Sequence, residues 1–217
     1  MSEKWVYAFK EGDGRNKQLL GGKGANLCEM TRIGLNVPPG FVITTEACLA
    51  CLATPERNLP EGVMAQVRVQ MAALEAATGR SFGGRENPLL VSVRSGSAMS
   101  MPGMMDTILN LGLNAETLHG LIAQTGNPRF AYDAYRRFIQ LFGKVALGVP
   151  DEAFDAEFEA ARQQAGVKHD IGLSAADLAA IAERFLAVVH EATGKPFPVD
   201  PHEQLEIAIK AVFNSWL

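Results

Sequence analysis

The chain has 217 residues, 47% of them hydrophobic, which is enough for one sizeable domain or two small ones with a real core. Its 20 Lys and Arg against 24 Asp and Glu give a formal charge of −4, which excludes a broad basic surface for nucleic acid or anionic lipid. No apolar run approaches the roughly 20 residues that span a bilayer, and the N-terminus lacks the apolar core of a secretory signal. We therefore expect a cytoplasmic protein that binds neither nucleic acid nor membrane.

The first 114 residues mix signals for short strands with signals for helices. One run, residues 89–93, has the length and β-branched content of a buried strand, so Arg94 is expected where that strand opens into a loop. We expect strands at residues 5–9, 40–44 and 89–93, and helices at residues 22–33 and 61–78.

After Asn114 the pattern changes, because long stretches show helical spacing and none shows strand alternation. Ser174 with Asp177 resembles a capping box that opens one of these helices. Trp216 and Leu217 continue the apolar stripe of the last helix with no stop signal, so we expect the chain to be cut from a longer protein. The expected helices begin near residues 127, 151, 174 and 201.

A lysine stands among glycines at residues 21–24, GGKG, directly before a predicted helix. Glycines let backbone amides approach a ligand closely, and a helix start adds partial positive charge, so this segment is an anion site in outline. It is not a Walker A loop, because Lys17 stands where the first glycine should be and Gly24 where Ser or Thr should bind magnesium. Taken alone, it is also compatible with a plain turn that carries an exposed lysine.

The segment after Arg94 is a second candidate for phosphate binding. Residues 95–103 carry no charge, are rich in hydroxyl and backbone N–H groups, and end in a Pro-Gly turn signal. A guanidinium binds phosphate oxygens bidentately and a lysine supplies a compact charge, so Arg94 and Lys23 together would neutralise a polyphosphate. They lie far apart in the sequence, and only the fold brings them together.

The cysteine pattern leaves two alternatives to a structural role. Cys48 and Cys51 have CxxC spacing, which suits a thiol redox pair or half of a zinc site. No second CxxC or HxxxH follows, and none of the four histidines lies in a metal or nucleophile motif. We expect both cysteines to be buried as small apolar groups on a short helix, and no metal ligand within the chain.

Four segments together closely resemble the N-terminal part of the pyruvate, phosphate dikinase family. They are LLGGKGANLCEM, NVPPGFVITTEAC, LLVSVRSGSAMSMPGMMDTILNLGLN and GNPRFAYDAYRRFIQLFG. The match runs in order through nearly the whole chain, and MPGMMDTILNLGLN is its most specific part. Phosphoenolpyruvate synthases share the arginine and the later Gly-x-x-Asp-Thr, but have a longer acidic loop between them. The short loop here favours the dikinase.

The resemblance implies a helix-rich α+β fold, the first portion of an ATP-grasp-type nucleotide-binding domain. Residues 1–112 would form a mixed α/β nucleotide-binding subdomain completed by a helix at residues 200–217. Residues 113–199 would form an inserted, mainly helical subdomain.

The resemblance also implies the reaction. The family converts ATP, phosphate and pyruvate to AMP, pyrophosphate and phosphoenolpyruvate through a phosphohistidine on a separate domain. Lys23 and Arg94 would hold the ATP phosphates, Arg94 having the catalytic role, and residues 95–103 would close over them. The remaining ATP-binding positions would be Gly22, Ser95, Gly103 and Thr107.

Several parts of the family's machinery have no counterpart in this sequence. They are the second ATP-binding half with its Mg²⁺ ligands, the phosphohistidine domain and the pyruvate-binding barrel. The resemblance thus implies a fragment that is inactive alone, from an enzyme that is a homodimer. Two other functions remain open, a phosphoenolpyruvate synthase-like ATP-binding domain and a non-catalytic helical module that recognises another protein.

Overall fold

The structure is a computed structural model, and it describes residues 3–96 and 107–216. The chain divides into two compact units. Unit 1 comprises residues 1–80, 94–107 and 209–217, and unit 2 comprises residues 81–93 and 108–208. Both are helix-rich and carry small two-stranded sheets, which confirms the expected α+β class.

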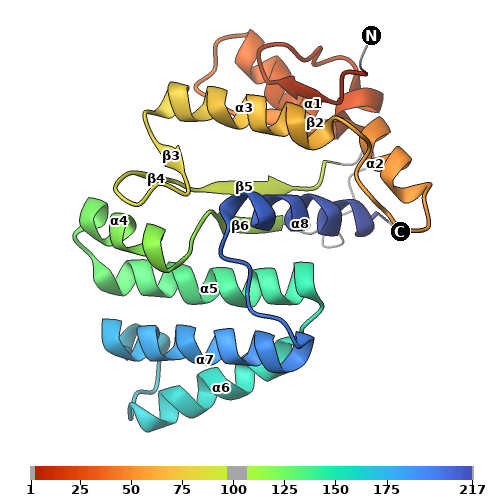
Figure 1. Ribbon diagram of the computed structural model, residues 1–217. Coiled ribbons are helices and arrows are strands. Elements are labelled where there is room, and N and C mark those ends of the chain that lie inside the picture. The colour runs from red at the N-terminus through yellow and green to blue at the C-terminus, as the bar shows by residue number, and fades with distance from the viewer. Residues whose placement is uncertain (1–2, 97–106, 217) are drawn as a thin grey trace. The chain divides into compact units, whose positions relative to one another are not determined.

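Unit 1 is built around a short antiparallel strand pair. Strands β1 (Val6–Ala8) and β2 (Phe41–Ile43) pair with Val6 opposite Ile43, so both expected strands are present but shorter. Helix α3 (Val63–Thr78) packs against both strands, as Figure 1 shows. Of the four residues on its predicted apolar face, Val63, Val67 and Met71 are buried, whereas Leu74 is half-buried.

Helix α1 (Lys17–Arg32) is interrupted near its start. Gly21 has φ 68° and ψ 166°, so a first turn ends there and a continuous helix begins at Gly22, where the sequence predicts it. The hydroxyl of Thr45, the first residue of α2 (Thr45–Leu52), donates to the carbonyls of Gln18 and Leu19 and fixes the turn before the break.

Unit 2 contains two small sheets and most of the remaining helices; Arg94 and Thr107, at the ends of the second sheet, and residues 209–214 of the last helix belong to unit 1. The parallel pair β3 (Ser81–Phe82) and β4 (Pro88–Leu89) lies close to α4 (Ala115–Thr125), and β5 (Val91–Arg94) pairs with β6 (Thr107–Leu111). The expected strand at residues 89–93 is therefore divided between β4 and β5. It is also not fully buried, because among the described residues β5 has one partner strand, and its own residues alternate between half-buried and exposed.

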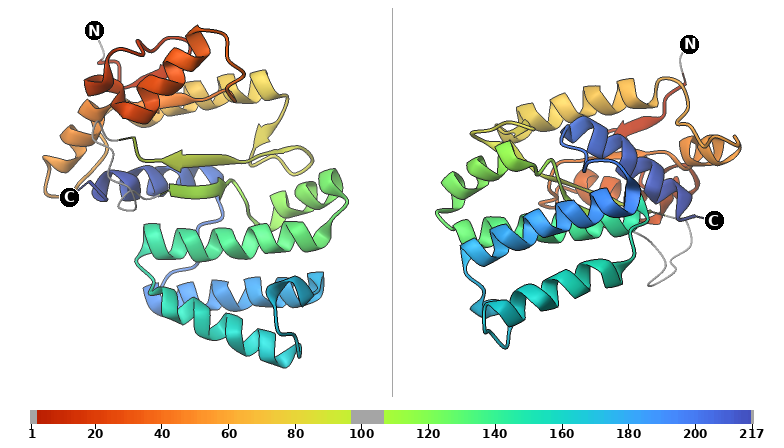
Figure 2. Two further views of the ribbon diagram at one scale, coloured as in Figure 1. Left: turned by 180° about the vertical axis from the view of Figure 1, so that it is seen from behind. Right: turned by 60° about the horizontal axis from the view of Figure 1, so that its bottom comes forward.

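Three helices lie side by side in unit 2, in the order α5, α7 and α6 (Figures 1 and 2). They are α5 (Pro128–Leu147), α6 (Asp151–Gln164) and α7 (Ala175–Thr193), with the 3-10 turn η1 (Asp170–Gly172) before α7. Aromatic rings fill the layers between them, as in the edge-on pair of Phe154 and Phe185, 5.0 Å apart. Ser174 and Asp177 form the predicted capping box.

Helix α8 (Pro201–Asn214) ends earlier than its apolar stripe predicts. Trp216 lies beyond it, because the last turn tightens and the N–H of Trp216 donates to the carbonyl of Phe213. Within the part of the chain that the structure describes, no helix is both long and apolar enough to cross a membrane.

Candidate phosphate site

Gly21 and Gly96 bring the two candidate phosphate segments together within unit 1. An ideal Cβ on Gly21 would overlap the carbonyl oxygen of Gly96, and the positive φ of Gly21 also disfavours any other residue. A Cβ on Gly96 would stand 3.7 Å from Cβ of Lys23 and 3.8 Å from N of Gly24. The backbone two residues after Arg94 therefore lies directly beside Lys23.

The break at Gly21 gives the segment 22–24 a helix N-terminus of its own. The first N–H groups of a helix lack partners within that helix, and they favour a negative charge in front of them. Gly24 is buried against β2. A Cβ there would stand only 2.8 Å from Cγ1 of Val42, so the absence of a side chain allows α1 to pack on β2. Lys23, between Gly22 and Gly24, is exposed.

Arg94 and Thr107 occupy equivalent ends of a strand pair. Arg94 is the last residue of β5 and is exposed, while Thr107 is the first residue of β6 and is half-buried. Ser95, directly after Arg94, is only 1% exposed, and its hydroxyl accepts a 2.8 Å hydrogen bond from Nε1 of Trp216. Arg94 therefore ends its strand, as the sequence predicts, and Ser95 and Gly96 after it are neither helix nor strand.

The predicted ATP-binding residues that the structure describes all fall in unit 1, namely Gly22, Lys23, Arg94, Ser95 and Thr107. Gly103 and most of the segment 95–103, expected to close over the phosphates, lie outside the described residues. The structure brings Lys23 next to Gly96, and with it the two segments that the sequence separates.

Neither Lys23 nor Arg94 has a carboxylate partner among residues 3–96 and 107–216. Nine other ion pairs are present in this part of the chain. An arginine at a strand end often pairs with a nearby carboxylate, and the described part of the chain offers none to Arg94. Lys23 lies at the start of the continuous part of α1, where the helix N-terminus and the ammonium together attract an anion.

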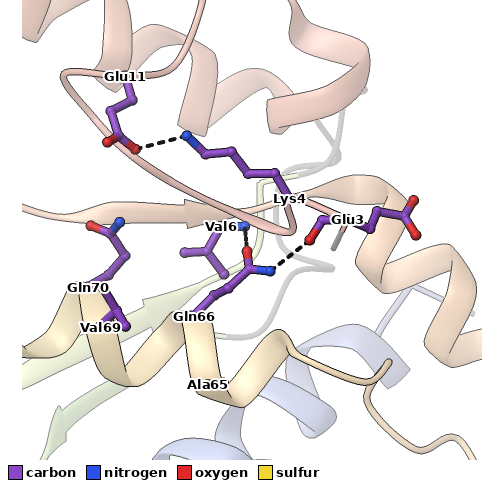
Figure 3. A pocket seen from close by; sticks show the side chains of 8 residues that line it. All are labelled: Glu3, Lys4, Val6, Glu11, Ala65, Gln66, Val69 and Gln70. Carbon is purple, nitrogen blue, oxygen red and sulfur yellow. Dashed lines mark hydrogen bonds and ion pairs between the residues drawn. The ribbon is translucent and has the colours of Figure 1, made fainter. Parts of the chain in front are cut away.

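A surface cavity of about 450 Å³ lies elsewhere in unit 1 (Figure 3). Gln66 of α3 dominates its polar chemistry: the amide accepts from the N–H groups of Trp5 and Val6 and donates to the carbonyl of Glu3. Lys4 and Glu11 pair across the same opening at 3.3 Å. The Gln66 bonds hold the N-terminal segment on α3, so these polar groups have a structural explanation.

The cysteines have the predicted buried positions. Cys28, Cys48 and Cys51 are unpaired thiols with at most 1% exposure, and Cys48 and Cys51 lie on the short helix α2. Burial raises the pKa of Cys48 to about 12, and it also raises the pKa of Cys28 and Cys51. A redox pair needs an accessible thiolate, so this geometry argues against one.

No metal centre is evident in residues 3–96 and 107–216, which contain no group of three or more His, Cys, Asp or Glu placed to hold an ion. Mg²⁺ usually needs carboxylates together with substrate phosphates. The described side chains therefore do not fit a Mg²⁺ site by themselves.

Sequence reasoning missed two residues that shape the site. Gly21 is required by its contact with Gly96, whereas the sequence suggested that its glycines serve the approach of a ligand. Trp216 was assigned only to an apolar stripe, yet its indole bonds to Ser95. The doubled glycine was a usable signal for the first residue, but no local pattern marked the second.

Comparison with known proteins finds similarity to one enzyme family. Residues 17–56, which contain GGKG and the CxxC helix, match the family model described as "Pyruvate phosphate dikinase, AMP/ATP-binding domain". The chain is 58% identical over 212 residues to a pyruvate, phosphate dikinase of Entamoeba histolytica, which covers 98% of this chain and 24% of that protein.

Two further relatives carry the same name. The dikinase of Clostridium symbiosum is 50% identical over 98% of this chain and 24% of its own length. A chloroplastic dikinase of Arabidopsis thaliana is 49% identical over 100% of this chain and 23% of its own length. The chain thus spans about a quarter of the length of the relatives that it matches.

Proposed function

Since this chain is related along its whole length to pyruvate, phosphate dikinases, we propose that it is the N-terminal part of such an enzyme and that it holds the phosphates of ATP. One observation carries the proposal. The fold sets the backbone after Arg94 beside Lys23, and neither cation is paired with a carboxylate among the described residues.

The two cations suit different tasks. The guanidinium of Arg94 offers a planar fork that matches two phosphate oxygens, and the ammonium of Lys23 is a compact charge at a helix start. Gly22 and Gly24 flank Lys23 with backbone N–H groups, Ser95 follows Arg94, and Thr107 begins the strand that pairs with β5. Together these groups would neutralise a polyphosphate and stabilise the charge that develops during phosphoryl transfer.

The rest of the reaction belongs to the proposal for the parent enzyme. Conversion of ATP, phosphate and pyruvate to AMP, pyrophosphate and phosphoenolpyruvate needs a phosphohistidine domain, a pyruvate site and Mg²⁺ ligands, which the resemblance assigns to other parts of the parent enzyme. The same holds for the ATP-grasp topology, the helical subdomain at residues 113–199, the homodimer and the cytoplasmic location. These stay predictions, and the chloroplastic relatives show that location varies among dikinases.

Calorimetric titration of the chain with ATP and Mg²⁺ tests the phosphate site. We expect Lys23→Ala and Arg94→Ala each to weaken binding by about 1–3 kcal/mol, since each removes a charge-assisted contact. Lys10→Ala and Arg68→Ala remove exposed cations of the same unit and should leave the affinity unchanged. If all four variants bind ATP as the unaltered chain does, or if that chain shows no binding, the proposal is wrong.

A further inference from the structure

Trp216 reaches the segment that follows Arg94 from the opposite end of the chain. Its indole Nε1 donates a 2.8 Å hydrogen bond to Oγ of Ser95, across 121 positions of sequence. Both residues belong to unit 1. The bond therefore ties Trp216, the last described residue, to the segment 95–96 that follows Arg94.

This segment is held from two sides. Ser95 is 1% exposed and takes the indole hydrogen bond on its side chain, while the carbonyl of Gly96 abuts Cα of Gly21. A buried residue with a fixed hydroxyl leaves the preceding residue little freedom, because one peptide unit separates them. The direction in which the chain presents Arg94 therefore depends on Ser95.

Trp216 is itself anchored within unit 1. Sγ of Cys48 lies 4.0 Å from the carbonyl of Phe213, and Nη1 of Arg57 donates to Oδ1 of Asn214 at 3.2 Å. The N–H of Trp216 then donates to the carbonyl of Phe213 at 3.1 Å. These contacts fix the end of α8, so the indole is a stable support for Ser95.

We propose that Trp216 is a positioning residue of the phosphate site. Through Ser95 it fixes the backbone that carries Arg94, and so it sets the alignment of the guanidinium with the phosphates that Lys23 also binds. This inference rests on the proposed function. It adds a residue that touches no phosphate and that acts only through the indole hydrogen bond.

A double-mutant cycle on the full chain tests the proposal, with ATP affinity and unfolding by denaturant measured for each variant. Trp216→Phe keeps an aromatic ring but removes the N–H, and Ser95→Ala removes the acceptor. We expect each to weaken ATP binding by about three- to tenfold, the range that one net hydrogen bond supports. The double variant should be no weaker than either single variant, because both remove the same bond.

Trp5→Phe is the matched control. Trp5 is the chain's other tryptophan, and its indole donates to the carbonyl of Glu61 at 3.1 Å, away from the phosphate segment. This variant is expected to lower stability without changing ATP affinity. It also leaves Trp216 as the single tryptophan, whose fluorescence we expect ATP to change, and Ser95→Ala should reduce that change.

The outcomes separate the two proposals. If Arg94→Ala weakens ATP binding but Ser95→Ala and Trp216→Phe do not, the positioning role is wrong and the phosphate site stands. Losses that add in the double variant also overturn the positioning role. If the unaltered chain binds no ATP, both proposals fail. Should Trp216→Phe not fold, Ser95→Ala and the fluorescence of Trp216 in Trp5→Phe decide the question.

Discussion

The carbonyl oxygen of Gly96 occupies the space that a Cβ on Gly21 would need. This contact joins Gly21, just before Lys23, to Gly96, two residues after Arg94. Any residue with a side chain at position 21 would therefore have to move one of these two segments. The proposed phosphate site therefore depends on a backbone contact that involves neither cation directly.

Replacement of Gly21 by alanine should lower the free energy of unfolding by more than the strain of a positive φ alone. Gly34 has φ 81° with nothing within 4 Å of an added Cβ, so Gly34→Ala isolates the backbone strain, about 1–2 kcal/mol. Gly21→Ala adds the overlap with Gly96, and we expect it to lower the free energy of unfolding by at least about 1 kcal/mol more and to weaken ATP binding. Urea unfolding measures both variants, and equal losses would refute the backbone contact.

Gln204 supports unit 2 from a fully buried position. Its amide accepts from the N–H of Gly112 and donates to the carbonyls of Leu113 and Pro198 at 2.9–3.0 Å. Gln204→Ala leaves these backbone groups without a partner, so we expect a loss of about 2–4 kcal/mol in denaturant unfolding. Gln124→Ala, which removes an exposed amide bonded to Asn87, should change stability by less than about 0.5 kcal/mol. Similar midpoints for the two variants would contradict this role.

The buried thiols predict slow chemistry in the folded protein. With the pKa of Cys48 raised to about 12 by burial, and those of Cys28 and Cys51 also raised, an aromatic disulfide reagent at pH 8 should label none of them quickly. In guanidinium all three should react. Rapid labelling of the native chain, or a disulfide between Cys48 and Cys51 under mild oxidation, would restore the redox interpretation of the CxxC spacing.

The capping box of α7 predicts one pH-dependent contribution to stability. The hydroxyl of Ser174 donates to the carboxylate of Asp177 at 2.6 Å and its backbone N–H at 2.8 Å, and these bonds lower the pKa of Asp177. Because the folded pKa lies below the unfolded value, the contribution is present above about pH 4 and is lost as the pH falls through the folded pKa.

Urea unfolding of the unaltered chain and of Asp177→Asn, between pH 7 and pH 2.5, measures this contribution. The stability difference between the two should shrink as the carboxylate is protonated. In Ser174→Ala the pH dependence should be weaker, because the hydroxyl donor is gone. A difference that stays constant down to pH 2.5 would contradict the cap.

Elements with a local signal were predictable from the sequence. Ser174 and Asp177 mark a helix start within four residues, and the small apolar surroundings of Cys48 and Cys51 indicate a buried helix. The helix α4 had a weaker signal and was not anticipated. Its capping box uses Thr117 in place of Glu or Gln. Gly120 also interrupts its apolar stripe, and a glycine is needed there because a Cβ would overlap the carbonyl of Arg85.

Contacts between distant segments were not predictable from residue patterns. The apolar stripe that contains Trp216 predicts that this residue is partly buried, but it does not predict that the indole N–H bonds to Ser95. Likewise GGKG and the segment after Arg94 were each predicted to bind an anion. Only the resemblance to a family indicated that the two segments belong to one site. Their proximity comes from the pairing of Gly21 with Gly96, which no spacing in the sequence expresses.

The most direct test of the phosphate site is to map ATP on the chain by amide chemical shifts in ¹⁵N-labelled protein. We expect ATP to shift the backbone N–H signals of Gly22, Lys23, Gly24 and Gly96, and Arg94→Ala to abolish these shifts at the same ATP concentration. Shifts that instead cluster around Gln66 and Gln70, at the cavity of Figure 3, would contradict it, as would a spectrum that ATP leaves unchanged.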